Sequence, residues 1–251
     1  MMGVKEQIIQ FIKDEVKDNN KNSFFREPLV GFSSANDELY KNIKEIVGKH
    51  HLFPEEILPE VKSVVSFFIP FSEELIESNR GREVSEEWAK SYVEGNSLIN
   101  STCEKLAEKL KEDGIKSGIV KATFGYDKEL LMAVWSHRSA AFIAGLGRFG
   151  VNRMLITEKG GAGRYGSLLI SEPIEPDKRP DKDHCYTLSG GKCSYCTDIC
   201  PVNAIKPDGF ERRKCQERLA VVGRNFRHIG TCDVCGKCVV GPCAIFEGDQ
   251  K

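Results

Sequence analysis

The cysteines are the sequence feature that most constrains this chain. Nine of its ten cysteines follow His184, and only Cys103 lies earlier. Residues 1–20 are charged throughout and lack the apolar segment of an export signal, so we expect a cytoplasmic protein whose thiols are kept reduced. Dense cysteine in that compartment is more often metal-binding or catalytic than disulfide-bonded. The C-terminal segment is therefore the first place to look for chemistry.

Charge and hydropathy argue against two classes of partner. The 251 residues carry 36 Lys and Arg against 37 Asp and Glu, a net charge of −1. A balance this close to neutral provides no global field for nucleic acid or an anionic membrane. No apolar run reaches the roughly 18–20 residues of a membrane helix, so no membrane partner is expected. The arginines and lysine between 212 and 227 indicate a solvated helix face.

The first 180 residues predict a mixed α/β domain with its own core. Apolar periodicity predicts helices over 3–18, around 99–110 and over 129–143 (broken at 135–138), and strands over 61–71, 154–157 and 167–171. Cys103 lies on the apolar face of the second helix, which predicts a buried thiol, and Gly114 is expected to close that helix. Prolines between 173 and 180 mark a linker. We therefore place one domain at 1–180 and a second at 181–251.

Two groups of cysteines follow the linker. The first group is Cys185, Cys193, Cys196 and Cys200, followed directly by Pro201. Its Cys-x2-Cys-x3-Cys-Pro core matches the end of the bacterial ferredoxin motif, in which the fourth cysteine binds the other of two clusters. The second group, which partly repeats this pattern, is Cys215, Cys232, Cys235, Cys238 and Cys243.

The nine thiols exceed by one the eight positions of two 4Fe–4S clusters. In a crossed arrangement, the first cluster is held by Cys185, Cys193, Cys196 and Cys243. Cys200 then joins three of the remaining thiols to hold the second cluster. Two structural zinc sites are the alternative, because four-cysteine zinc also uses Cys-x2-Cys pairs. The Cys-Pro step, the x3 spacing and the duplication favour iron–sulfur clusters.

Residues 145–150 spell G-x-G-x-x-G, the string of a dinucleotide fingerprint. That fingerprint must follow a strand and open a helix, whereas here a helical stretch precedes the glycines and a predicted strand follows them. A dinucleotide site is therefore not expected. The glycines permit either a tight structural turn or close approach of the backbone to a flat ligand, and both interpretations stay open.

Three segments of the chain resemble a known family. Residues 140–152, Ala-Ala-Phe-Ile-Ala-Gly-Leu-Gly-Arg-Phe-Gly-Val-Asn, are similar to the A-A-x-x-A-G-L-G-x-x-G-x-N segment of epoxyqueuosine reductases. Residues 166–177 resemble that family's G-S … L-x-P-D stretch, and 58–70 resemble its early core strand. The resemblance covers 55–243. It suggests a short form without the C-terminal helical repeats that longer members use to hold transfer RNA.

The resemblance implies a nitroreductase-like α/β domain that binds base-off cobalamin, followed by a ferredoxin-like domain with two 4Fe–4S clusters, as in reductive dehalogenases. It places the corrinoid against Gly145, Leu146, Gly147, Arg148, Phe149, Gly150 and Asn152. It also matches Cys215 to an isolated family cysteine, so that the second cluster is held by Cys200, Cys215, Cys235 and Cys238. Cys232 is then surplus, whereas an ordinary ferredoxin pattern would use Cys232 in place of Cys215.

One position departs from the family pattern. Epoxyqueuosine reductases carry an aspartate general acid shortly before the A-G-L-G segment, and Leu131 stands at that position. The ionisable residues nearby are Asp127, Glu129 and His137, each more typical of a solvated side chain than of a proton donor. The proton donor and the substrate are therefore left unassigned.

The combined expectation is a cytoplasmic iron–sulfur oxidoreductase with a corrinoid as its reactive centre. Reduced ferredoxin or flavodoxin would supply electrons, which pass through the two clusters to cobalt. The substrate would be a small molecule or a modified nucleoside; transfer RNA is suggested by the family but not supported by the charge. The alternative is a non-catalytic electron-transfer protein that serves a separate corrinoid or redox enzyme.

Overall fold

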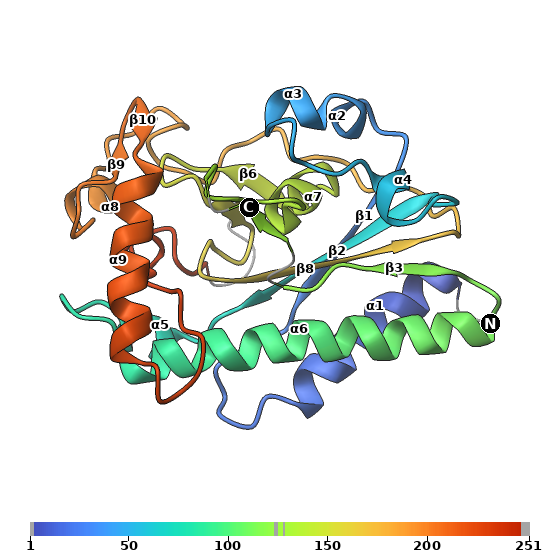
Figure 1. The fold of residues 1–251 in the computed structure, drawn as a ribbon, viewed down its shortest axis with the longest axis horizontal. Helices are drawn as coiled ribbons and strands as arrows, with labels where there is room; N and C mark the ends of the chain where they lie inside the picture. Colours follow the sequence, from blue (N-terminus) through green and yellow to red (C-terminus); the bar gives the residue numbers. More distant parts are fainter. Residues whose placement is uncertain (1–2, 123–124, 128, 247–251) are drawn as a thin grey trace.

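A four-stranded antiparallel sheet forms the centre of the molecule (Figure 1). The computed structural model describes residues 3–122, 125–127 and 129–246. The strands run in the order β1 (Leu29–Ser34), β2 (Ser63–Pro70), β8 (Gly163–Ile170) and β3 (Ser117–Ile119). Every residue of β2 is buried, because the strand is central and both of its faces are covered. The strand predicted at 61–71 is confirmed.

Helices cover both faces of this sheet. The helices α1 (Val4–Asp18) and α6 (Glu86–Glu112) pack on one face, and α7 (His137–Ile143) packs on the other. The α6 helix begins where Ser85 Oγ accepts a hydrogen bond from Trp88 N, and ends before Gly114, whose φ of +76° suits the left-handed closing position. Cys103 on α6 is only 1% exposed, so its prediction as a buried core thiol is confirmed.

Shorter elements complete the fold. The connections before α6 contain α2 (Glu38–Lys41), α3 (Ile43–Ile46), α4 (Pro54–Ile57) and α5 (Glu73–Ser78). Two small hairpins pair β4 (Tyr126–Asp127) with β5 (Met132–Ala133), and β6 (Gly147–Phe149) with β7 (Leu155–Thr157). The cysteine-rich segment contains α8 (Tyr195–Asp198), β9 (Ile205–Lys206), β10 (Gly209–Phe210), α9 (Arg212–Asn225) and the 3-10 turn η1 (Lys237–Val239).

The helix expected over 129–143 is wrong in its first half, and only α7 from His137 is helical. Asp127 Oδ1 accepts hydrogen bonds from the backbone N–H groups of Glu129 (2.8 Å) and Leu130 (2.8 Å), which closes a turn. Leu131 follows with φ of +55°, a left-handed conformation that a helix cannot contain. The apolar residues of this stretch therefore belong to the β4–β5 hairpin.

The cysteine-rich segment packs onto the same hydrophobic core as the sheet and helices. Val222 of α9, Val239 of η1 and Ala244 join one buried cluster with Trp88 of α6. Figure 1 shows α9 standing across the α5 end of α6. The chain end also returns to the sheet, because the N–H of Gly161 donates to the carbonyl of Cys243 at 2.8 Å. The boundary near residue 180 stays a prediction.

Among the described residues, no helix combines the length and the apolar character that crossing a bilayer requires.

Candidate functional site

The first set of thiols comes from two distant parts of the chain. Cys193 and Cys196 flank the start of α8, and Cys243 approaches them from the chain end. Burial, together with the thiols of Cys185, Cys196 and Cys193, raises the pKa of Cys243 to about 11. Burial also raises the pKa of Cys196, with added contributions from Cys185 and Cys193. The fold therefore brings together Cys185, Cys193, Cys196 and Cys243, which we call group 1.

A second set of thiols assembles around α9. Burial raises the pKa of Cys215 to about 11, and Cys235 and Cys200 act on it in the same direction. The pKa of Cys238 is also raised, first by burial and then by Cys235, Cys215 and Cys200. These four thiols, Cys200, Cys215, Cys235 and Cys238, form group 2. Cys196 of group 1 also acts on Cys238, so the two groups are neighbours.

Cys232 lies apart from both groups. Its side chain is fully buried, and its Sγ points to the carbonyl oxygen of Ala89 on α6 at 3.8 Å. Burial and then Asp233 raise the pKa of its thiol. The structure thus seats Cys215 beside the other group 2 thiols, whereas Cys232 packs against α6.

The donor set around group 2 suits an iron–sulfur cluster. Trp88 Nε1 and Arg218 Nε are buried N–H groups that have no hydrogen-bond partner within the described part of the chain. Arg218 interacts with Cys235, and the indole of Trp88 lies directly against Gly236 between Cys235 and Cys238. Buried donors of this kind are costly unless an acceptor completes them, and the sulfurs of a cluster are such acceptors. Within the same residues, no three ligand-type side chains converge on one point for a single metal ion.

Two buried cations also contact the loops of group 2. Lys237, only 2% exposed, lies in η1 between Cys235 and Cys238. Its pKa is lowered by burial, an effect that Cys235 opposes. The side chain of Arg218 is 15% exposed, which corrects the expectation of a solvated position on α9. Burial, the largest single influence, lowers the pKa of Arg218, but hydrogen bonds to Glu83 and Cys235 outweigh it and leave the pKa raised.

The glycine loop packs tightly against the protein itself. A Cβ on Gly145, which has φ of +79°, would crowd the carbonyl oxygen of Lys178. One on Gly147, within β6, would collide with the carbonyl oxygen of Ile156 in β7. One on Gly150 would lie 2.7 Å from Ile156 Cδ1. Gly145 and Gly147 are thus required by backbone packing, so the space where their Cβ atoms would lie provides no cradle for a corrinoid.

The polar residues of the loop fasten it to the cysteine-rich segment. Asn152, 5% exposed, donates from Nδ2 to the carbonyl oxygen of Cys238 at 2.9 Å. Arg148 pairs with Asp183 at 2.8 Å and donates to the carbonyl of Pro180. Phe149 packs on Phe142, with ring centroids 5.7 Å apart. The loop is therefore the joint between α7 and the segment that carries both thiol groups.

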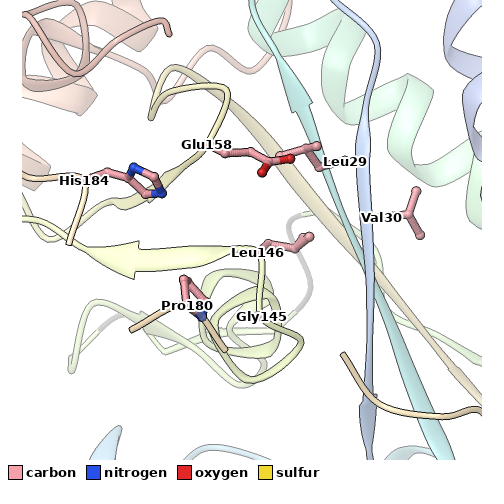
Figure 2. Close-up of a pocket in the computed structure, with 7 residues that line it drawn as sticks. All are labelled: Leu29, Val30, Gly145, Leu146, Glu158, Pro180 and His184. Atoms are coloured by element: carbon pink, nitrogen blue, oxygen red, sulfur yellow. The ribbon is translucent and has the colours of Figure 1, made fainter. Parts of the chain in front are cut away.

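Two hollows lie near these elements. Leu146 and Gly145 line the first, of about 150 Å³, opposite Glu158 and His184 (Figure 2). The second, of about 450 Å³, lies between the loop around Leu131 and the start of α9 near Arg212. Only the second is within the size range of ordinary ligand pockets, and it adjoins the position of the family aspartate.

Arg138 at the start of α7 faces group 2. Its side chain is exposed to solvent, yet burial within the surrounding protein lowers the pKa of its guanidinium, while Tyr165, Cys238 and Cys215 raise it. Arg138 Nη1 donates to the carbonyl oxygen of Arg153 at 3.2 Å. Arg138 is therefore an exposed cation at the start of α7 that interacts with the thiols of group 2.

Two ionisable residues near Leu131, Asp127 and His137, make hydrogen bonds that hold the local structure. Two backbone N–H groups, from Leu130 and Glu129, lower the pKa of Asp127 and keep it ionised. His137 is not a solvated side chain: Nε2 donates to the carbonyl of Lys121 (3.2 Å), so Nδ1 accepts from the Ser167 hydroxyl (2.8 Å). Burial lowers the pKa of His137 to about 4, so the imidazole is neutral at pH 7.

We expect His137 to make folding stability fall in acid. The unfolded imidazole binds a proton near pH 6.5 and the folded one only near pH 4, so the free energy of unfolding decreases between those values, by up to about 3 kcal/mol. His137→Gln removes this titration. Urea midpoints at pH 7 and pH 5, measured anaerobically, should fall more in the wild type than in the variant. Equal losses in both would contradict this assignment.

Three cations of the site escaped sequence reasoning: Arg138, Arg218 and Lys237. Of the three, only Lys237 could have been found from the sequence. It lies inside a Cys-x2-Cys spacing, where a charged residue is enclosed by the ligand loop. Arg218 is indistinguishable in sequence from its exposed neighbours on α9. Arg138 acquires its role only when the cysteine-rich segment folds back over α7.

The chain is similar in sequence to epoxyqueuosine reductases. It is 27% identical to that of Pseudomonas aeruginosa over 177 residues, which are 67% of this chain and 45% of the relative. It is 28% identical to that of Cyclobacterium marinum over 198 residues, 73% of this chain and 59% of the relative. The chain thus spans about half the length of these curated relatives. No family model matches it.

The solved structures point the same way. The epoxyqueuosine reductase of Streptococcus thermophilus superposes with a TM-score of 0.58 at 20% identity, over 96% of this chain and 66% of the other. An epoxyqueuosine reductase with a modified tRNA stem loop gives 0.56 at 21% identity, over 96% and 68%. A reductive dehalogenase described with a B12-dependent mechanism gives 0.52 at 18%, over 71% and 23%. The chain therefore resembles the epoxyqueuosine reductases in sequence and in fold, as its motifs predicted, and shares its fold with reductive dehalogenases.

Proposed function

We propose that the protein is an iron–sulfur oxidoreductase of the epoxyqueuosine reductase type, with one 4Fe–4S cluster on group 1 and another on group 2. The observation that carries this proposal is the assembly of eight cysteines into two adjacent sets of four, with unpartnered N–H donors beside the second set. Four thiolates are what each such cluster needs. A low-potential one-electron donor, such as reduced ferredoxin or flavodoxin, would supply the electrons.

The corrinoid belongs to the proposal on different grounds. The packed glycines do not form a cradle for it, so its support is the sequence likeness and the shared fold with a B12-dependent dehalogenase. When bound, the corrinoid would supply a strongly reducing metal centre. The chain's own contribution would be the exposed side chain of Arg138, which interacts with Cys238 and Cys215 of group 2. The substrate, whether a modified nucleoside in transfer RNA or a smaller molecule, is left open.

A non-catalytic electron-transfer protein is the second candidate. The observation in its favour is the packing of Gly145 and Gly147 against backbone atoms of Lys178 and Ile156, which leaves no room for a corrinoid where their Cβ atoms would lie. Binding of a corrinoid separates the two functions.

We expect anaerobically purified protein to contain about eight iron atoms per chain and to show the broad visible absorption of cubane clusters. The iron content follows from two sets of four thiols, and is measured by metal analysis against protein concentration. Stoichiometric zinc without iron would contradict the proposal and restore the zinc alternative.

A further inference from the structure

The two thiol groups differ in the charge that surrounds them. The groups acting on Cys196 and Cys243 of group 1 are other thiols. Arginine and lysine side chains, in contrast, act on group 2: Arg138 on Cys215, and Arg218 and Lys237 on Cys235. This asymmetry concerns the reduction potentials that the two clusters would have, so the argument below rests on the proposed function.

Lys237 is held in a cage built for a charged ammonium. Its Nζ donates to Asn79 O (2.7 Å), Asn79 Oδ1 (2.8 Å) and Glu83 O (2.6 Å). An ammonium carries three N–H donors and a neutral amine only two, so three acceptors match the charged form. Asn79, itself fully buried, also donates from Nδ2 to the carbonyl of Cys235 at 3.0 Å. The ammonium is thus fixed to the Cys235–Cys238 loop.

Arg218 reaches the same loop from α9. Its Nη2 is anchored to Glu83 Oε2 at 3.0 Å, and its buried Nε has no partner in the described structure. Because Arg218 interacts with Cys235, this free donor lies where a thiolate or sulfide acceptor would complete it.

Two acids oppose these cations only weakly. The side chain of Glu83 is 80% exposed, and Asp233 is also exposed, so water screens both carboxylates. The buried ammonium of Lys237 and the mostly buried guanidinium of Arg218 are screened much less. The charged side chains that water screens least beside Cys235 are therefore both cations, although Arg218 is also paired with Glu83.

We propose that Arg218 and Lys237, with Arg138 on the far side, raise the reduction potential of the group 2 cluster above that of the group 1 cluster. A positive charge and an N–H···S bond both stabilise the more negative, reduced cluster. With both clusters bound, one electron would pass from the reduced group 1 cluster, which is oxidised, to the group 2 cluster, which is reduced, with no proton transferred. Electrons supplied by a low-potential donor would thus move downhill toward group 2.

The experiment is an anaerobic redox titration followed by electron paramagnetic resonance on iron-loaded protein. A Cys193→Ser background, which disables group 1, identifies the signal of the group 2 cluster. Arg218→Gln is expected to shift that midpoint potential to a more negative value, and Arg218→Lys, which keeps the charge, to restore most of it. Arg224→Gln, an exposed substitution on the same helix, is the matched control and should leave the potential unchanged.

Lys237→Met supplies the second measurement, again expected as a more negative group 2 potential in protein that retains its iron. An unchanged group 2 potential in iron-replete Arg218→Gln protein would overturn the inference while leaving the proposed function intact. A shift of equal size in the Arg224→Gln control would overturn it as well. A wild-type chain that binds no iron would overturn both, and metal analysis distinguishes that case.

Discussion

Cys215→Ser is expected to lower the iron content from about eight to about four atoms per chain, whereas Cys232→Ser retains all of it. Cys235 and Cys200 both raise the pKa of Cys215, which places the three thiols together. Loss of the Cys215 thiol therefore leaves group 2 with three thiols. Cys232 is buried against Ala89 and outside both groups. Iron analysis of the two variants, purified side by side without oxygen, makes the comparison.

Cys103→Ser is the matched control for introducing serine at a buried cysteine. Cys103 is 1% exposed in α6, and burial raises the pKa of its thiol to about 12, so it is an inert part of the core. Its variant should keep full iron. If Cys232→Ser lost a cluster and Cys215→Ser did not, the ordinary ferredoxin ligand set would be right and the family-based assignment wrong.

The second large effect concerns cobalamin, which we expect wild-type protein to bind saturably and in the base-off form. Gly147 is a poor place to test this, because any side chain there meets the Ile156 carbonyl and would disrupt the β6–β7 hairpin. Arg138→Trp is better: the Arg138 side chain is exposed and interacts with Cys238 and Cys215 of group 2, so an indole there adds bulk beside that group without disturbing the hairpin. Binding should be lost while the iron content is unchanged.

Equilibrium dialysis and the corrinoid absorption spectrum measure this binding. Arg138→Lys, which keeps the charge and adds no bulk, and Arg224→Trp, which adds the same bulk on exposed helix surface, should both bind like the wild type. Wild-type protein that shows no saturable binding would leave the electron-transfer function as the remaining candidate.

Sequence periodicity was sufficient to predict the helices that are buried on one face and the strands that are buried on both. The apolar stripe of α1 and the uninterrupted β-branched and aromatic run of β2 each have one favourable solution, and the helix and the strand both lie where they were expected. The stretch 129–136 is as apolar as a helix, but the Asp127 turn and the left-handed Leu131 override that pattern. Turn chemistry of this kind acts through single hydrogen bonds and leaves little trace in periodicity.

The site was less predictable than its ligands. Cysteine spacing is set by local loop geometry, so the candidate cluster ligands can be predicted from the sequence. The cations around group 2 come from α7, α9 and η1, and their positions depend on how these elements pack. Similarly, the sequence of the glycine loop at 145–150 is the same whether the glycines make room for a ligand or for a neighbouring strand. The structure assigns them to packing, at Lys178 and Ile156.

The return of the chain end has a consequence for biosynthesis. Group 1 takes its fourth thiol from Cys243, whose carbonyl is tied to Gly161, while Cys200 lies between Cys196 and the rest of group 2 along the chain. Neither set of four thiols is therefore complete on a nascent chain until its last cysteines have left the ribosome: Cys238 for group 2 and Cys243 for group 1. With the proposed ligand sets, neither iron–sulfur cluster could be completed as the Cys185–Cys200 motif emerges, because each requires a cysteine from the second group.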